Sequence, residues 1–66
     1  MNASRQFVVE ERYELSLKLE KLSIFMNTDP FLALDITHQE LLKRQSQVMR
    51  LYRDILDQRL MTWKME

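Results

Sequence analysis

The chain has 66 residues, of which 45% are hydrophobic and 30% charged, with no glycine, no cysteine and one proline. This length fits one domain over residues 1–66, the scarcity of turn-forming residues predicts an all-α fold, and the lack of cysteine excludes disulfides and thiolate metal sites. Ten acidic residues balance ten basic ones, which does not favour binding to DNA or to nucleic acids in general.

Hydrophobic residues at helical spacing predict a first helix over about residues 4–26. The residues of its narrow apolar arc, which we expect to face a second helix, are Val8, Leu15, Leu19, Leu22 and Met26. A second apolar set on the opposite side consists of Val9, Tyr13, Leu17 and Ile24. A monomeric hairpin needs one apolar stripe per helix, so the second set predicts assembly into a helical homo-oligomer.

A short connector is expected over about residues 27–37. Asp29 as a cap and Pro30 at the first helical position predict a single helical turn that ends near Leu34. The residues expected to cover the end of the molecule are Phe31, Leu32 and Leu34. Because short connectors make neighbouring helices antiparallel, the predicted fold is an antiparallel helical hairpin.

Thr37 and Glu40 fit a capping box and predict a second helix over about residues 38–64. The residues of its predicted apolar stripe are Leu41, Val48, Met49, Tyr52, Ile55, Leu56, Leu60 and Trp63. Gln45 and Arg59 fall within the same arc. The charged residues expected to point elsewhere are Arg44, Arg50, Arg53, Asp54 and Asp57.

Arg59 interrupts the stripe one turn from Ile55 and Trp63. A guanidinium keeps its charge at ordinary pH, and burying it unpaired is costly. Three interpretations are open: an ion pair with a carboxylate such as Glu11 across an interface, packing of the aliphatic stem at an exposed helix end, or contact with an anionic ligand. Periodicity alone favours the ion pair.

Lys18 and Lys21 lie on the flank of the first helix between its two apolar stripes. Either can extend over the edge of an interface or pair with an acid such as Glu14. Beside an oligomer seam, the two lysines could instead hold an anion. Aromatic side chains, including Phe7 and Trp63, could stack on bases, although packing in a core or interface is commoner for such residues.

Residues suited to catalysis are scarce. His38 is the single histidine, and its place at a helix start is explained by the capping turn. We therefore expect no enzyme activity, no cofactor and no metal site. No apolar run approaches the roughly 20 residues of a membrane span, and the start of the chain lacks the apolar segment of a signal peptide, so we expect a cytoplasmic protein.

Two motifs carry a resemblance to a known family. The first, E-x-x-E-L-x-x-K-x-x-K-L-x-x-F, consists here of Glu11, Glu14, Leu15, Lys18, Lys21, Leu22 and Phe25. The second follows the connector and consists of Leu41, Leu42, Gln45, Met49, Tyr52, Ile55, Leu56 and Arg59. In this order, over about residues 7–60, they resemble the small bacteriophage helical-hairpin sponges that bind cyclic nucleotides and counter the CBASS and Thoeris defences.

The resemblance implies a non-enzymatic protein that sequesters cyclic di- or trinucleotides, or cyclic ADP-ribose derivatives, in the cytoplasm of an infected bacterial host. It also implies a homo-oligomer, with a hexamer as the expected assembly. Arg59 and one of Lys18 and Lys21 would contact phosphates, with Phe7 and Trp63 as candidates for stacking on bases. The alternative is a structural or protein-interaction adaptor that has no small-molecule ligand.

Overall fold

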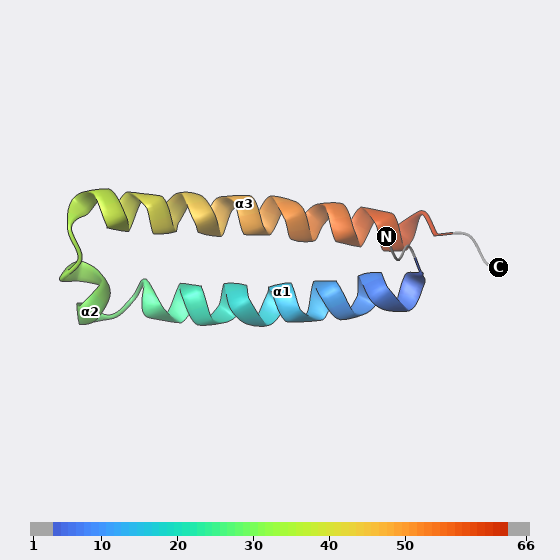
Figure 1. The fold of residues 1–66 in the computed structure, drawn as a ribbon, viewed down its shortest axis with the longest axis horizontal. Helices are drawn as coiled ribbons and strands as arrows, with labels where there is room; N and C mark the ends of the chain where they lie inside the picture. The colour runs from blue at the N-terminus through green and yellow to red at the C-terminus, as the bar shows by residue number, and fades with distance from the viewer. Residues whose placement is uncertain (1–3, 64–66) are drawn as a thin grey trace.

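The computed structural model describes residues 4–63, and this part of the chain forms a helical hairpin (Figure 1). Its helices are α1 (Arg5–Phe25), α2 (Asp29–Leu32) and α3 (Ile36–Met61). The two long helices, α1 and α3, lie side by side and antiparallel, while α2 closes one end (Figure 1). No helix within residues 4–63 is both long enough and apolar enough to cross a lipid bilayer.

The inner face of α1 agrees with the sequence analysis. Ser4 caps the helix, since its hydroxyl accepts a hydrogen bond from the backbone N–H of Phe7 at 3.2 Å. The residues of the predicted arc are either buried (Val8, Leu15 and Leu19) or half-buried (Leu22 and Met26). The prediction that this arc faces the second helix is therefore confirmed.

The turn at α2 is capped one residue earlier than predicted. The hydroxyl of Thr28 accepts a hydrogen bond from the backbone N–H of Phe31 at 3.4 Å, so Thr28 is the cap. Asp29 is the first residue of the helix, and Pro30 follows it within the first turn. The prediction of Asp29 as the cap is wrong because Thr28, also a good capping residue, stands directly before it.

Two of the three connector residues cover the end of the hairpin. Phe31 is buried and its ring meets that of Phe25 edge to face, with the centroids 5.9 Å apart. Leu34 is half-buried, whereas Leu32 is exposed, so the prediction for Leu32 is wrong. The side-chain amide of Gln39 donates to the backbone oxygens of Leu32 and Leu34, at 3.2 and 2.8 Å, and ties the connector to α3.

The start of α3 also differs from the prediction. Asp35 is the cap, because its carboxylate accepts a hydrogen bond from the backbone N–H of His38 at 2.8 Å. A carboxylate is favoured here by the partial positive charge of the helix start. The capping box is therefore wrong: Thr37 lies inside the helix, and Glu40 pairs with Lys43 at 3.2 Å.

The last residue of α3 is Met61, and Thr62 forms its C-terminal cap. The hydroxyl of Thr62 donates to the backbone oxygen of Gln58 at 2.9 Å. The predicted end of this helix at Lys64 lies outside the described residues.

The rotation of α3 about its own axis is the largest departure from the sequence analysis. The residues that face α1 are spaced alternately by four and three and are Leu42, Ser46, Met49, Arg53, Leu56, Leu60 and Trp63, all buried or half-buried. Half of the predicted stripe lies outside this face and is exposed, with exposed fractions between 39% and 63% for Leu41, Val48, Tyr52 and Ile55. The prediction is wrong for these four residues.

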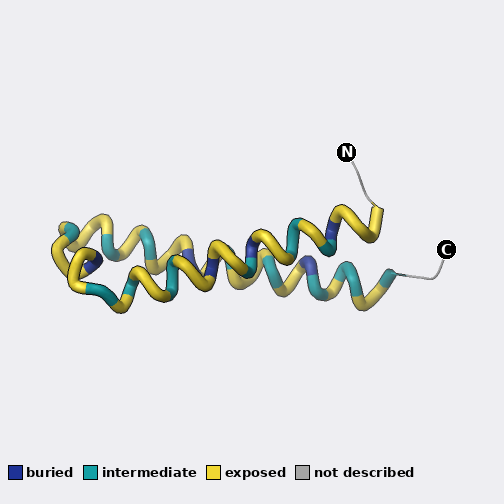
Figure 2. Tube along the Cα trace, turned by 90° about the horizontal axis from the view of Figure 1, so that it is seen from below, coloured by how far each residue is buried: buried dark blue, intermediate teal, exposed yellow. Residues whose placement is uncertain are grey.

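The core between the two long helices is small. Val8, Leu15 and Leu56 form its buried cluster, and half-buried side chains such as Met49 and Leu60 pack against it. Exposed positions cover most of both long helices, and buried positions are few (Figure 2). A lone core in so short a chain seldom supplies more than about 3–5 kcal/mol of stability.

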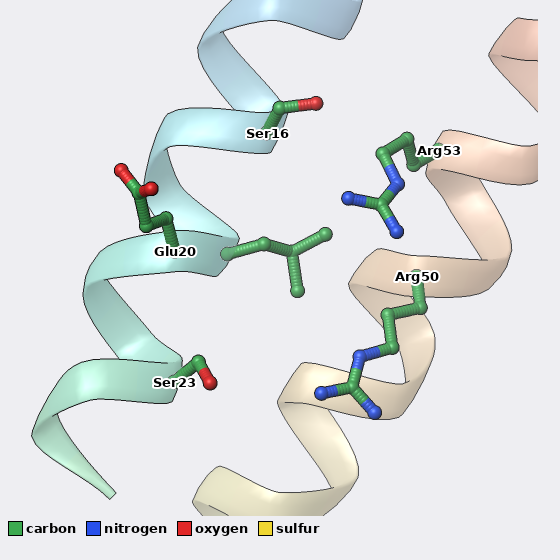
Figure 3. Close-up of a pocket in the computed structure, with 6 residues that line it drawn as sticks. Ser16, Glu20, Ser23, Arg50 and Arg53 are labelled. Atoms are coloured by element: carbon green, nitrogen blue, oxygen red, sulfur yellow. The ribbon is translucent and has the colours of Figure 1, made fainter.

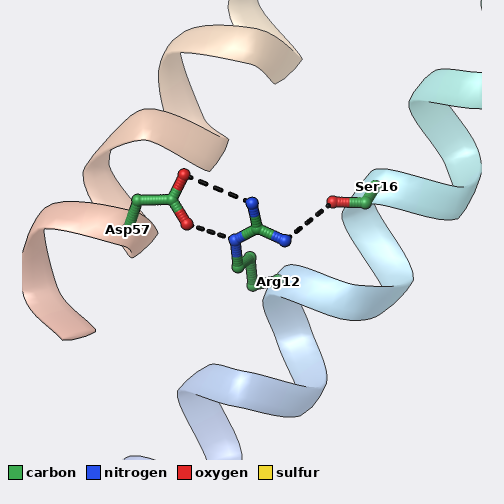
Figure 4. A network of polar contacts seen from close by, with 3 residues as sticks. All are labelled: Arg12, Ser16 and Asp57. Carbon is green, nitrogen blue, oxygen red and sulfur yellow. Dashed lines mark hydrogen bonds and ion pairs between the residues drawn. The ribbon is translucent and has the colours of Figure 1, made fainter. Parts of the chain in front are cut away.

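One flank of the hairpin is polar. Arg50 and Arg53 of α3 lie there opposite Ser16 of α1 (Figure 3). On the same flank the guanidinium of Arg12 donates to both carboxylate oxygens of Asp57, and its remaining nitrogen lies 3.5 Å from the hydroxyl of Ser16 (Figure 4). We call this side the Asp57 flank. The prediction that Arg50, Arg53 and Asp57 point away from the first helix is wrong.

The opposite flank carries a second link between the long helices. The hydroxyl of Tyr52 in α3 donates a hydrogen bond to the carboxylate of Glu11 in α1. We call this side the Tyr52 flank. Since one link holds each flank, α3 cannot turn in either direction without breaking one of them.

Replacement of each capping candidate by alanine tests where α3 begins. We expect Asp35→Ala to lower the free energy of unfolding by about 0.5–2 kcal/mol, because a backbone N–H of the first turn loses its acceptor. Thr37→Ala is the matched control and should leave stability nearly unchanged, since alanine suits the interior of a helix. Urea unfolding followed by circular dichroism measures both values. A larger loss for Thr37→Ala would contradict this helix start.

The Arg12–Asp57 pair predicts a pH dependence. The hydrogen bond from Arg12 is the largest influence and lowers the pKa of Asp57. Desolvation opposes this shift, and the positive charges of Arg12 and Arg53 lower the pKa further. The resulting stabilisation is present above the unfolded pKa of about 4 and is lost as the pH falls through the lower folded value. Carboxyl-carbon NMR should show that Arg12→Gln raises the pKa of Asp57.

A control variant, Lys43→Gln, removes the other ion pair within residues 4–63. It should leave the titration of Asp57 unchanged. An equal change in the pKa of Asp57 in both variants would show that general charge, rather than the direct contact with Arg12, sets its value.

Candidate functional site

The five predicted binding residues fall into two groups along the hairpin. Phe7 on α1, Arg59 on α3 and Trp63 just beyond it lie toward the end opposite α2. Lys18 and Lys21 lie further along α1, and the eleven residues from Phe7 to Lys18 correspond to roughly 16 Å of helix axis. A single hairpin therefore does not bring the five side chains together.

Three of these residues share the Tyr52 flank. Phe7 and Lys18 lie four and seven residues from Glu11, a spacing that places them on the same side of α1 as the contact with Tyr52. Arg59 lies seven residues after Tyr52 on α3, and its positive charge acts on the Tyr52 hydroxyl. The Tyr52 flank therefore carries an aromatic ring and two cations.

Exposed hydrophobic residues lie on the same flank as these cations. Leu41, Val48 and Ile55 lie at seven-residue intervals on the same side of α3 as Tyr52, and each is more than half exposed. A row of exposed hydrophobic residues along one side of a helix suits an interface. The Tyr52 flank therefore combines apolar area with positive charge, which suits contact with a second helix, an anion or both.

The hydrogen bond between Tyr52 and Glu11 bears on the ion pair that the sequence favours between Arg59 and a carboxylate such as Glu11. The hydrogen bond to Glu11 raises the pKa of Tyr52, as do desolvation and the negative charge of Glu11, while Arg59 acts in the opposite direction. Glu11 thus receives its hydrogen bond from Tyr52 rather than from Arg59. Within residues 4–63 the ion pairs are Arg12–Asp57 and Lys43–Glu40, and Arg59 takes part in neither.

The two predicted aromatic residues differ in their surroundings. Phe7 is 39% exposed at the start of α1. Trp63 is half-buried and packs against the core cluster of Val8, Leu15 and Leu56. Trp63 therefore contributes to packing within the hairpin, whereas Phe7 presents more of its ring to solvent. The ligand contacts predicted for both residues stay predictions.

The outer side of α1 carries the second apolar stripe. Tyr13 and Ile24 are more than 60% exposed, and Leu17 is 39% exposed. A shallow groove on this side is lined by Val9, Glu10, Tyr13, Glu14 and Leu17. Neither Arg59 nor the lysines line it, so this surface is separate from the predicted binding residues.

The Asp57 flank contains a groove that the sequence analysis missed. It encloses about 390 Å³ and is lined by Ser16, Leu19, Glu20, Ser23, Arg50 and Arg53 (Figure 3). The available signal was the position of Arg53, which continues the alternating spacing of Ser46, Met49 and Leu56 along the inner face of α3. This position does not indicate a groove when the apolar stripe is centred on Tyr52 and Ile55, as the sequence analysis predicts.

Comparison with known proteins identifies a family. The sequence model of the Sequestin family matches residues 3–62. No curated protein and no solved structure matches the chain. The family name denotes sequestration, which indicates a binding role rather than a catalytic one. Because the match extends over almost the whole hairpin, the chain belongs to the Sequestin family.

Proposed function

We propose that the protein binds and sequesters cyclic oligonucleotide immune signals, and that this blocks activation of the effector they control. The signals are cyclic di- or trinucleotides or cyclic ADP-ribose derivatives, and the protein acts for a phage in the cytoplasm of the infected host. Membership of the Sequestin family supports sequestration. The choice of ligand rests on the sponge-like motifs and on the cations of the Tyr52 flank.

The observation that carries this proposal is a second seam on α3. Its residues lie beside the inner seam at alternating steps of four and three and are Leu41, Gln45, Val48, Tyr52, Ile55 and Arg59. All of them except the half-buried Arg59 are exposed. Such spacing is typical of a helix that packs against another helix. Because α1 already covers the inner seam, the outer seam needs a helix from elsewhere. A further copy of the chain would supply it and form a homo-oligomer, for which we propose a hexamer.

Assembly along the outer seam creates a need for an anion. Copies that meet there bring several Arg59 and Lys18 side chains close together, and like charges repel unless negative charge lies between them. A cyclic oligonucleotide offers two or three phosphates, which arginine binds through paired hydrogen bonds and lysine as a point charge. Phe7 and Trp63 would stack on its bases, and Lys21 would add charge at the edge.

This mode of action requires no bond to be broken. A protein that holds a signal tightly lowers its free concentration, and the effector then remains inactive. His38, the single histidine, lies exposed in the first turn of α3 at the α2 end of the hairpin, away from Arg59. The proposed function therefore depends on affinity and on the number of copies, rather than on turnover.

Calorimetry with a panel of cyclic di- and trinucleotides and cyclic ADP-ribose derivatives tests the ligand class. We expect at least one of them to bind and to be recovered intact after the protein is denatured. At 100 times its Kd, a ligand that binds only the folded protein adds about 2.7 kcal/mol to stability and raises the unfolding temperature. If no member of the panel binds, the proposed function is wrong.

Two variants test the binding residues. We expect Arg59→Ala and Lys18→Ala each to weaken binding by about tenfold or more, because each removes a charged hydrogen-bond donor from the phosphates. Lys43→Ala, on a part of α3 outside the seam, is the control and should bind normally. Light scattering should give all three variants the mass of the wild-type oligomer. A monomeric wild-type protein at micromolar concentration would contradict the assembly and favour the adaptor alternative.

A further inference from the structure

The groove on the Asp57 flank has two cations on one wall and small hydroxyls on the other. Arg50 and Arg53 extend from α3 toward α1, and Ser16 and Ser23 lie on the opposite wall (Figure 3). Leu19 is buried between the helices and forms the floor. These side chains come from one hairpin, so the groove is complete without a second copy of the chain.

The carboxylates of this flank do not neutralise the two arginines. Asp57 receives hydrogen bonds on both of its oxygens from Arg12, and Arg53 acts on it only through its charge. Glu20 lines the groove, yet the ion pairs within residues 4–63 include neither Glu20 nor either groove arginine. The groove therefore keeps positive charge that only Glu20 opposes from within its lining.

The spacing of the two arginines suits a phosphate group. Arg50 and Arg53 stand three residues apart on a helix, which makes them neighbours on its surface. Both remain charged at any ordinary pH, so they repel each other until an anion lies between them. A phosphate accepts paired hydrogen bonds from each guanidinium, and the hydroxyls of Ser16 and Ser23 are able to donate to its remaining oxygens.

We propose that this groove is an anion site that binds a phosphate or pyrophosphate group within a single hairpin. Its volume of about 390 Å³ lies at the lower end of the range for small-molecule sites, which is about 300–1,000 Å³. It lies on the Asp57 flank, whereas Arg59 and Lys18 lie on the Tyr52 flank. The protein thus has a second site, whose occupation does not depend on the assembly or on the ligand proposed above.

Inorganic pyrophosphate is the first probe. NMR of the arginine side-chain Nε–H groups reports on Arg50 and Arg53 directly, and we expect their signals to move on titration while that of Arg44 stays in place. Arg50→Gln and Arg53→Gln should each weaken binding by about tenfold or more. Arg44→Gln removes the same charge from an exposed position of the same helix and should change affinity by less than about threefold.

A gain of affinity gives a sharper test. Glu20→Gln removes the single carboxylate that lines the groove and should tighten pyrophosphate binding by about threefold to tenfold. A residue with a merely structural role would not improve binding when changed. Circular dichroism checks that each variant is folded, and Arg50→Gln, at an exposed position, keeps the test valid even where Arg53→Gln unfolds.

The results separate this site from the proposed function. Equal weakening in Arg44→Gln and Arg50→Gln, or no movement of the Arg50 and Arg53 signals, would overturn the groove as an anion site. Arg59→Ala should leave pyrophosphate binding intact, and its loss in that variant would also overturn the separate site. The cyclic nucleotide panel decides the proposed function through the variants: binding that Arg59→Ala weakens and Arg50→Gln leaves unchanged lies on the Tyr52 flank, whereas binding with the opposite response lies in the groove.

Discussion

The rotation of α3 about its axis is the constraint on which this hairpin depends. The helix carries two apolar seams displaced by one residue, so a turn of about 100° would exchange one for the other. Both seams offer leucine or similar side chains, and burial alone distinguishes them weakly. The Arg12–Asp57 pair and the Tyr52–Glu11 hydrogen bond are partly exposed and individually modest in energy.

This rotation also divides the positive charge of the molecule. Arg50 and Arg53 come to lie on one flank and Arg59 on the other, although ten residues of the same helix include all three. One flank offers a groove within a single chain, and the other offers an apolar surface that a neighbouring helix would cover. The two proposed sites therefore differ in kind: the first needs only the fold, and the second needs the assembly.

Periodicity predicted the two long helices, the antiparallel hairpin and the inner face of α1, since one apolar arc of α1 is continuous from Val8 to Met26. The facing side of α3 could not be predicted in this way, because its apolar residues extend over two adjoining seams. Both caps were assigned to the wrong neighbour for a similar reason: threonine and aspartate stand one or two residues apart at each start and both suit the position. The groove was missed because it forms only when α3 has the rotation that the Arg12–Asp57 and Tyr52–Glu11 links hold.

Equal numbers of acidic and basic residues affect how long polyanions compete with small anions for this protein. Long polyanions such as transcripts and chromosomes are attracted by summed, long-range charge, and a protein without net charge gives them little to hold. A short ligand that concentrates its charge at one or two phosphates instead responds to local guanidinium groups. A neutral chain thus favours small anions over long polymers at the two arginines of the groove.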